Sequence, residues 1–587
     1  MEHTEGKPTW QEQRTRFLNR VAARRAARAR PATAFLSQPE PRTIGTFSKG
    51  RQLLAGNFLF AGFLVEAPDS SPWDIRMPAP RFEEDLHGFR WLDDLAAVGD
   101  LPSRRAAQSW TWDWIARYGR GRGAGWTPDL TGRRVIRWIN HAIFLLRGQD
   151  ADASRAFFAA LGAQTIFLSR RWHVAASGLP RFEALTGLIY AGLSLAGQET
   201  HVAPAVKALC KECNALIDKS GGLPTRNPEE LLEVFTLLIW TAQALIDSGR
   251  HPDAPLEAAI VRMAPTLRAL RHSDGSLARF HGGGRGMEGR LDHALAASGI
   301  RPEPHEGLAM GFARMAAGRT TVLVDAAAPP TGEASVNAHA STLAFELTSG
   351  RRPIVVNCGP GATFGETWRR AGRATPSHST LGVDGLSSSR LGVVGLGRGR
   401  RGEILHDLPS EVRAQFSANA HLVHLLAGHD GYVATHGLTH VRQLGLARDG
   451  RALEGEDTLG ALNEADRARF ERQLTATQLQ GVSFTIRFHL HPDVDATLDM
   501  GGYAVSLGLK SGEIWVFRHE GSSRLSLEPS VYLEAGRLKP RATKQIVISG
   551  RVVDAACQIN WTFAKAQDTP QAIRDIVRDD DEHLSDD

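Results

Sequence analysis

The chain contains 587 residues, of which 42% are hydrophobic and 23% charged, and it carries a net charge of +5. This length exceeds what one hydrophobic core supports and predicts about two to four domains, and the composition excludes wholesale disorder. Four cysteines are too few to hold so long a chain together as a disulfide scaffold. The small positive charge favours an acidic partner without requiring one.

Residues 1–44 are predicted to form a basic N-terminal arm. Seven arginines lie between Arg14 and Arg30, in an alanine-rich run whose composition is typical of a helix. Two interpretations stay open: a solvated, frayed arm, or a segment that contacts an anionic surface. The sequence shows neither a secretory signal nor an apolar stretch of about eighteen residues, so on these grounds alone we expect a cytoplasmic protein without a membrane-spanning helix.

From residue 45 to 285, apolar residues recur at helical spacing, as in RRVIRWINHAIFLL and PEELLEVFTLLIWTAQALID. One helix is expected to start at Thr127-Pro128. Another is expected at Asn227-Pro228, because asparagine is a good N-cap and proline fits the first helical position. Many amphipathic helices with short connections predict stacked helical hairpins that form an open barrel or a toroid of helix pairs.

Cys210 and Cys213 form a CxxC pair inside this region. The surrounding sequence predicts an amphipathic helix, on which a spacing of three places both thiols on one face. No second CxxC and no histidine pair lie nearby, so we interpret both cysteines as half-buried apolar residues rather than as zinc ligands.

Residues 286–302 are rich in Gly, Pro and charge and are predicted to be a linker. From 303 to 566 the chain carries short β-branched or alternating runs, such as VSFTIRFHLHP and KQIVISG, separated by turn dipeptides. Strands without intervening helices predict an antiparallel β-sandwich. Residues 567–587 are strongly acidic at their end and are predicted to be a disordered tail.

Histidines are frequent in the predicted sandwich. Asn337 and His339 are two residues apart, as are His489 and His491, and residues two apart in a strand share a face. Imidazole, together with amide or carboxylate ligands from neighbouring strands, can hold a divalent metal. Taken singly, each histidine is more often a hydrogen-bonded structural residue, so both interpretations stay open.

The stretches AHASTLAFELTSGRRPIVVNCGPG and ATPSHSTLGVDG resemble the C-terminal signature of the heparinase II/III-like family of polysaccharide lyases. HDGYVATHGLTHVRQLGL and RFHLHPDV fit later strands of that family, and GLPRFEALTGLIYAGLSLAG and GGLPTRNPEELLEVFTLL resemble two helices of its catalytic cleft. The resemblance covers the chain from about Trp110 to Trp561. It implies an incomplete (α/α) toroid of helical hairpins packed on an antiparallel β-sandwich, and family members usually work in the periplasm or the cell envelope.

The resemblance also implies β-elimination of an acidic polysaccharide that contains uronic acid. The reaction needs the C5 carboxylate neutralised, the C5 proton removed and the leaving oxygen protonated. In the family, an Asn-His pair and a Tyr come from the toroid and a His from the sandwich. Here Leu179 and Pro180 replace the Asn-His pair, Glu183 is kept, Glu230 takes the position of the Tyr, and Asn337 takes that of the sandwich His. Asn337 cannot act as a base, because an amide has no useful pKa near neutrality.

Other groups of the expected cleft are candidates to replace those missing. Arg226 could neutralise a uronate carboxylate through a bidentate contact. Glu230 could act as the base if burial raises its pKa, with Asn227 and Glu183 beside it, and two carboxylates could also support hydrolysis. Alternatively, Asn227 to Glu230 is an ordinary helix N-terminus, and Glu183 pairs with Arg181 or another base.

Some family members hold a structural zinc beside the sandwich His. His339, Asn357 and His378 match its ligand positions, with Asn357 in the place of an Asp. A neutral amide in place of a carboxylate weakens such a site. The three residues are therefore candidates either for a weak zinc site or for a hydrogen-bonded cluster between strands, and no cofactor is firmly predicted.

Two further features are candidates for substrate contact. The loop RFHGGGRG, with His281 and Arg285, could close over a sugar chain, since its glycines allow close backbone approach. Trp138 could stack on a sugar ring, as could Trp110, Trp112 and Trp114, although tryptophans on these helices are more often core residues.

The leading hypothesis from the sequence is a lyase that acts on an acidic polysaccharide by β-elimination with a modified catalytic set. A non-catalytic polysaccharide-binding protein and a carboxylate-dependent glycoside hydrolase are the alternatives. Nucleic-acid binding is not expected, because the sequence carries no recognised nucleic-acid motif outside the basic arm.

Overall fold

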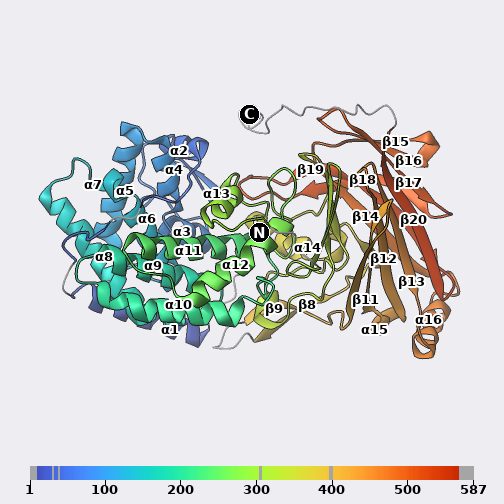
Figure 1. Cartoon of the computed structure of the whole chain (residues 1–587), viewed down its shortest axis with the longest axis horizontal. Helices are drawn as coiled ribbons and strands as arrows, with labels where there is room; N and C mark the ends of the chain where they lie inside the picture. The colour runs from blue at the N-terminus through green and yellow to red at the C-terminus, as the bar shows by residue number, and fades with distance from the viewer. Residues whose placement is uncertain (1–8, 30–31, 38–39, 303–306, 396–400, 567–587) are drawn as a thin grey trace.

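The structure, a computed structural model, describes residues 9–29, 32–37, 40–302, 307–395 and 401–566. The predicted acidic tail lies outside these residues. A helical domain and a β-sandwich lie end to end along the long axis of the molecule (Figure 1). The predicted fold class, an (α/α) toroid followed by an antiparallel β-sandwich, is confirmed.

The toroid consists of helices joined by short connections. These are α2 (Phe47–Leu54), α3 (Pro80–His87), α4 (Arg90–Val98), α5 (Leu101–Tyr118), α6 (Pro128–Asn140), α7 (Ala142–Leu146), α8 (Ala151–Arg171), α9 (Leu179–Ser194), α10 (Val202–Leu216), α11 (Pro228–Asp247) and α12 (Ala254–Ala269), with a hairpin of β1 (Asn57–Phe60) and β2 (Phe63–Glu66). Both predicted helix starts are confirmed, because α6 begins at Pro128 and α11 at Pro228. The Asn227 side chain caps α11, accepting hydrogen bonds from the amides of Glu229 and Glu230 at 3.0 and 3.1 Å.

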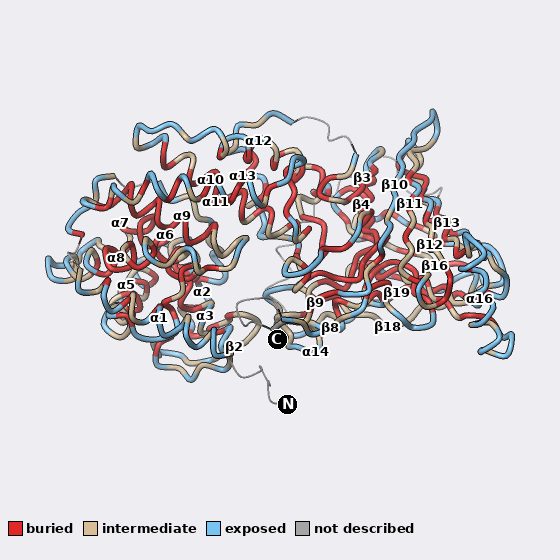
Figure 2. Tube along the Cα trace, turned by 90° about the horizontal axis from the view of Figure 1, so that it is seen from below, coloured by how far each residue is buried: buried red, intermediate tan, exposed pale blue. Residues whose placement is uncertain are grey.

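One continuous hydrophobic core fills the toroid and reaches the first strands of the sandwich, where Phe312, Leu323 and Ala344 join it. Cys210 and Cys213 are free and buried in this core on α10. Figure 2 shows buried residues along the inner helices and sheets, and exposed residues around the rim. Burying apolar surface on this scale is the main term that stabilises each domain.

Two helices occupy segments for which the sequence indicated an arm and a linker. Helix α1 (Trp10–Ala26) packs against α8 and buries Ala23 and Ala26, so this part of the arm is docked rather than frayed. Its Trp10 and Phe17 are exposed. Helix α13 (Arg290–Ala297) lies within the predicted linker and packs against α11. A Gly- and charge-rich composition therefore concealed a short helix held by tertiary contacts.

The sandwich is built from two antiparallel sheets. The first has the order β10 (Val412–Ala418), β11 (Leu422–Tyr432), β12 (Leu438–Ala447), β13 (Ala452–Gly460), β20 (Ala556–Lys565), β17 (Ile514–Glu520), β16 (Ala504–Gly508) and β15 (Asp495–Asp499). The second has the order β18 (Arg524–Tyr532), β19 (Arg541–Val552), β14 (Val482–Leu490), β6 (Arg352–Val356), β5 (Phe345–Ser349), β4 (Thr320–Asp325) and β3 (Phe312–Ala317), with β7 (Leu381–Val383) paired to β14. Alternating burial, as along β13, turns one face of each strand toward the shared core.

The sandwich domain also contains smaller elements outside the two large sheets. These are the hairpin of β8 (Arg390–Gly395) and β9 (Arg401–His406), and helices α14 (Glu366–Gly372), α15 (Val433–His436) and α16 (Glu464–Ala476). No helix within the described ranges has both the length and the apolar character needed to cross a bilayer.

Candidate functional site

Helices α6 and α9 pack unusually closely, and this contact sets up the site. A Cβ placed on Gly187 would lie 2.5 Å from the Cα of Gly132, so neither position accepts a larger side chain without displacement. The close approach brings Arg133 of α6 to Glu183 of α9, where the Arg133 Nε donates to Glu183 Oε1 at 2.5 Å. The pairing partner that the sequence left open for Glu183 is therefore Arg133, while Arg181 pairs with Glu212.

Glu183 is a buried carboxyl with one oxygen left over. The residue is only 3% exposed, and its Oε2 has no hydrogen-bond partner within the described residues. Burial raises the pKa of Glu183, although the charge and hydrogen bond of Arg133 oppose the rise. A carboxyl of this kind can hold a proton and donate it to an acceptor that enters the site.

The N-terminus of α11 supplies two more carboxyls. Glu229 and Glu230 are half-buried in its first turn, and burial raises the pKa of both. The charge of Glu183 raises the pKa of Glu230 further, so these two carboxyls interact. Glu229 Oε2 accepts a hydrogen bond from the Gly284 amide at 2.7 Å, which fixes the glycine-rich loop on α11. Glu230 is thus a proton acceptor with a pKa shifted toward neutrality.

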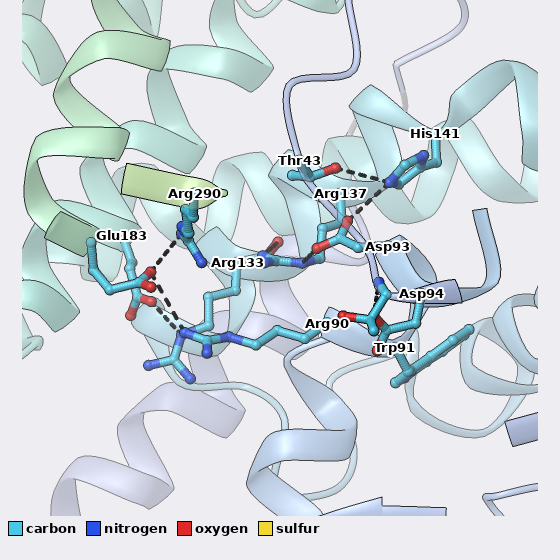
Figure 3. A network of polar contacts seen from close by, with 12 residues as sticks. Thr43, Arg90, Trp91, Asp93, Asp94, Arg133, Arg137, His141, Glu183 and Arg290 are labelled. Carbon is cyan, nitrogen blue, oxygen red and sulfur yellow. Dashed lines mark hydrogen bonds and ion pairs between the residues drawn. The ribbon is translucent and has the colours of Figure 1, made fainter. Parts of the chain in front are cut away.

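A group of arginines, which we call the arginine row, continues from Glu183 into the toroid. It consists of Arg133 and Arg137 on α6, Arg90 at the start of α4 and Arg290 at the start of α13 (Figure 3). Glu233 pairs with Arg290 at 2.7 Å and approaches Arg90 at 3.9 Å. Sequence reasoning missed this row, although the i, i+4 spacing of Arg133 and Arg137 on one predicted helix was a usable signal.

Arg226 does not face a substrate, which corrects its expected role. Its five N–H groups donate to the carbonyl oxygens of Met310, Gly311, Ala327 and Ala328 and to Asp325 Oδ1, at 2.6 to 3.0 Å. A guanidinium has five N–H donors, so none is left for a uronate carboxylate. The residue ties the toroid to the first strands of the sandwich, and it adopts a left-handed φ of 50° to do so.

The glycine-rich loop is anchored rather than free to close. His281 is 1% exposed, its Nε2 lies 3.3 Å from Asp325 Oδ2, and its Nδ1 accepts the His339 amide. Arg285 lies 3.7 Å from Asp274 and lines a small charged cavity that includes neither Glu183 nor Glu230. His281 is therefore a buried anchor of the loop, Arg285 lines a separate cavity, and their contact with substrate stays a prediction.

Trp138 is a core residue and not a sugar platform. It has no exposed surface, and its ring stacks on Phe157 with a centroid distance of 5.4 Å. Trp114 packs edge-on against Trp138. The apolar stripe of α6 thus serves toroid packing, which corrects the substrate-binding expectation for Trp138.

The residues carried over from the family's zinc site do not fit a three-ligand metal centre. The His339 and His378 rings lie 5.1 Å apart and are buried. Asn357 is committed elsewhere, because its Oδ1 accepts the Ser379 amide at 3.0 Å and its amide nitrogen donates to Glu346. Within the described ranges, no group of three or more His, Cys, Asp and Glu side chains is placed to hold a metal.

The histidine pair is instead an enclosed neutral cluster. Burial lowers the pKa of His339, and it lowers that of His378 to about 3. Of the two rings, His339 Nδ1 and both nitrogens of His378 have no hydrogen-bond partner within the described residues. Asn337, by contrast, is exposed, and its Cβ would be 3.1 Å from a Cβ on Gly282. The sandwich thus offers an amide, not a base, next to the loop.

Comparisons with known proteins agree with this architecture. A family model described as Heparinase II/III-like, C-terminal, matches residues 299–562. FtsZ-localized protein C of Caulobacter vibrioides (strain NA1000 / CB15N) is 30% identical over 540 residues, which cover 90% of this chain and 89% of that protein.

Solved structures share the fold at much lower identity. Heparinase III superposes with a TM-score of 0.66 and 12% identity, covering 93% of this chain and 89% of that chain. A mutant of the heparan sulfate lyase HepC from Pedobacter heparinus superposes with a TM-score of 0.57 and 14% identity, covering 95% of this chain and 89% of that chain. The family model matches the β-sandwich, and the relative is 30% identical over 90% of the chain. Because the fold is also the same, the chain belongs to the heparinase II/III-like family.

Proposed function

We propose that this protein is a lyase that cleaves a uronic-acid-containing polysaccharide by β-elimination, with carboxyl groups in place of the family's His and Tyr. The observation that carries the proposal is the pair Glu183 and Glu230, whose charges interact and whose pKa values are both raised, with the Arg133 guanidinium bound to Glu183. Perturbed carboxyls grouped in this way are typical of acid–base sites.

Glu230 is the proposed base. Its carboxylate takes the C5 proton, the C5–H electron pair forms the C4–C5 double bond, and the C4–O bond breaks. Glu230 then returns the proton to the departing glycosidic oxygen, so that one carboxyl serves both transfers. A raised pKa makes the ionised form a stronger base and the protonated form available at a pH closer to neutrality.

Arg133 and Glu183 are proposed to stabilise the charge that develops on the uronate carboxylate. Arg133 is half-buried and supplies a positive charge, and the unpartnered Oε2 of Glu183 donates to the carboxylate when Glu183 is protonated. The amide groups of Asn227 and the exposed Asn337 are proposed to orient the sugar by hydrogen bonding.

Incubation with a set of uronate polymers tests the proposal. The unsaturated product of elimination absorbs in the ultraviolet, so a rising trace is expected with the wild-type chain and with the exposed control Glu257→Gln. New reducing ends with a flat trace would show hydrolysis by the carboxyl pair instead. Binding with neither signal would show a non-catalytic polysaccharide-binding protein.

A second candidate function is association with FtsZ. The 30% identity to FtsZ-localized protein C extends over 90% of this chain, which favours this candidate independently of the cleft chemistry. Sedimentation with FtsZ filaments tests it: the chain is expected in the pellet when FtsZ is polymerised with GTP, and in the supernatant when it is not. Equal recovery in both would rule the candidate out.

A further inference from the structure

A cavity of about 190 Å³ lies inside the toroid, and neither Glu183 nor Glu230 lines it. Its wall is formed by side chains of α2, β1, α3, α4, α6, α11 and α13 and by the segment before α2. Ordinary sites for drug-sized ligands measure about 300–1,000 Å³, so this cavity takes one small group rather than an oligosaccharide. We call it the arginine cavity, because Arg90, Arg137 and Arg290 of the arginine row line it.

These three arginines carry more N–H donors than the surrounding residues supply acceptors. Arg137 is 7% exposed; its Nε donates to Asp93 at 2.8 Å and its Nη1 to the Arg133 carbonyl. Arg290 has one hydrogen bond, to Glu233, and Arg90 has only the 3.9 Å approach to that same carboxylate. Their other N–H groups have no acceptor in the part of the chain that the structure describes.

The acidic side chains of the cavity are already engaged or partly neutral. Asp93 accepts from Arg137 and is 2.9 Å from His141 Nε2 (Figure 3). Asp94 accepts the Thr46 amide at 2.7 Å, and burial raises its pKa to about 6. Asp85 accepts the Ala61 amide at 3.3 Å. These carboxyls orient the wall, and within the described residues none of the three forms a hydrogen bond with Arg90 or Arg290, whose partner is Glu233.

The arginines also act on one another. Burial lowers the pKa of Arg137, and the nearby charges of Arg90 and Arg290 lower it further. Like charges held close together repel unless an anion lies between them, and Glu233 supplies a carboxylate beside Arg90 and Arg290. Lys49 at the cavity wall adds a further positive charge. The cavity is thus built as the complement of a small, multiply charged anion.

We propose that the arginine cavity binds a sulfate or phosphate group. A carboxylate offers two oxygens and is satisfied by one guanidinium, whereas a tetrahedral oxyanion presents several acceptors and suits donors that arrive from three different helices. The apolar remainder of the wall, which includes Trp240 and Met287, is compatible with a carbon skeleton attached to that group. The group therefore enters either as a free ion or as a substituent of a polysaccharide.

Calorimetric titration of the full chain with inorganic sulfate and with inorganic phosphate tests the proposal. The wild type is expected to show saturable, one-site binding of at least one of these ions. Arg90→Gln and Arg290→Gln each remove a charged donor, so binding should weaken by about tenfold or more. Arg105→Gln removes an exposed arginine of the same domain and should bind as the wild type does. Two variants are used because Arg290 also pairs with Glu233, whereas Arg90 has no hydrogen bond to lose.

Absence of saturable binding by the wild type, or equal affinity in Arg90→Gln, Arg290→Gln and wild type, would overturn the proposal. A second arm identifies the source of the group by comparing a sulfated uronate polymer with its desulfated form. Tighter binding of the sulfated polymer by wild type but not by Arg90→Gln shows a polymer substituent. Equal binding of both polymers, with the inorganic ion still bound, shows a free ion. These readouts do not depend on cleavage, so failure of the lyase proposal would leave them intact.

Discussion

On the toroid side of the domain junction, burial raises the pKa values of Glu183, Glu229 and Glu230, whereas on the sandwich side it lowers those of His339 and His378. Burial favours the neutral form in both places, but the consequences differ. Glu229 and Glu230 remain half-buried and can exchange protons with a bound ligand, while the two histidines are enclosed in the sandwich. At this junction, the carboxyls that are half-buried and have raised pKa values therefore lie in the toroid, while the sandwich contributes enclosed histidines and the exposed amide of Asn337.

The largest expected effect concerns the link between the two sides. Arg226→Met should lower the free energy of unfolding by about 3–5 kcal/mol, because it leaves Asp325 buried without its ion pair. Scanning calorimetry of the full chain measures this, with Arg105→Met as an exposed control. A thermal midpoint equal to that of the wild type would mean that Arg226 is not a structural tie and would reopen its role in substrate binding.

The enclosed histidines predict acid sensitivity of the sandwich. A histidine with a folded pKa of about 3 binds fewer protons than its unfolded form below about pH 6.5, so its share of stability is present above that pH and is lost as the pH falls. For His378 the loss between about pH 7 and pH 5 is about 2 kcal/mol. His378→Leu should show a correspondingly weaker loss of stability on acidification, measured by denaturant unfolding at several pH values.

The exposed His421→Leu serves as the matched control for this experiment, because it removes a histidine from the same sandwich without emptying the core. It should follow the wild-type dependence. An acid dependence that is the same in His378→Leu and wild type would show that His378 is protonated in the folded protein.

The smallest expected effect concerns Glu230 on the toroid side, where stability depends on pH in the direction opposite to that of His378. A carboxyl whose folded pKa is raised contributes stability below its unfolded pKa of about 4.5 and loses it as the pH rises through the folded pKa. Glu230→Gln removes the charge but keeps an acceptor. At neutral pH it should therefore raise the free energy of unfolding by up to about 1 kcal/mol, which is seen as a slightly higher thermal midpoint. Glu257→Gln should not. A lower midpoint for Glu230→Gln would indicate that the Glu230 charge stabilises the fold.

Periodicity was enough to predict the fold, because amphipathic helices and alternating strands each carry their period in the local sequence. The starts of α6 and α11 followed from proline and the Asn227 cap. Helix α13 was missed because its stability comes from packing against α11 rather than from its own composition. Helix α1 was expected to be a good helix former, but its docking on α8 needed the tertiary structure.

The candidate site was predictable only in part. Glu183 and Glu230 were found because the resemblance placed their helices at the cleft. The partners of Arg226, the core position of Trp138 and the engaged amide of Asn357 depend on residues far away in the sequence. The arginine row joins α4, α6 and α13, so no local motif describes it.

The central claim, that acid–base chemistry belongs to the toroid side, is tested most directly by comparing Glu230→Gln with Asn337→Ala on a uronate polymer that the wild type cleaves. Ultraviolet absorbance of the unsaturated product measures the rate of each variant. Loss of a proton-transfer group typically costs a factor of about 10² to 10⁴, so Glu230→Gln should lose that much activity while Asn337→Ala retains most of it. Full activity in Glu230→Gln, with loss of activity in Asn337→Ala, would contradict the account.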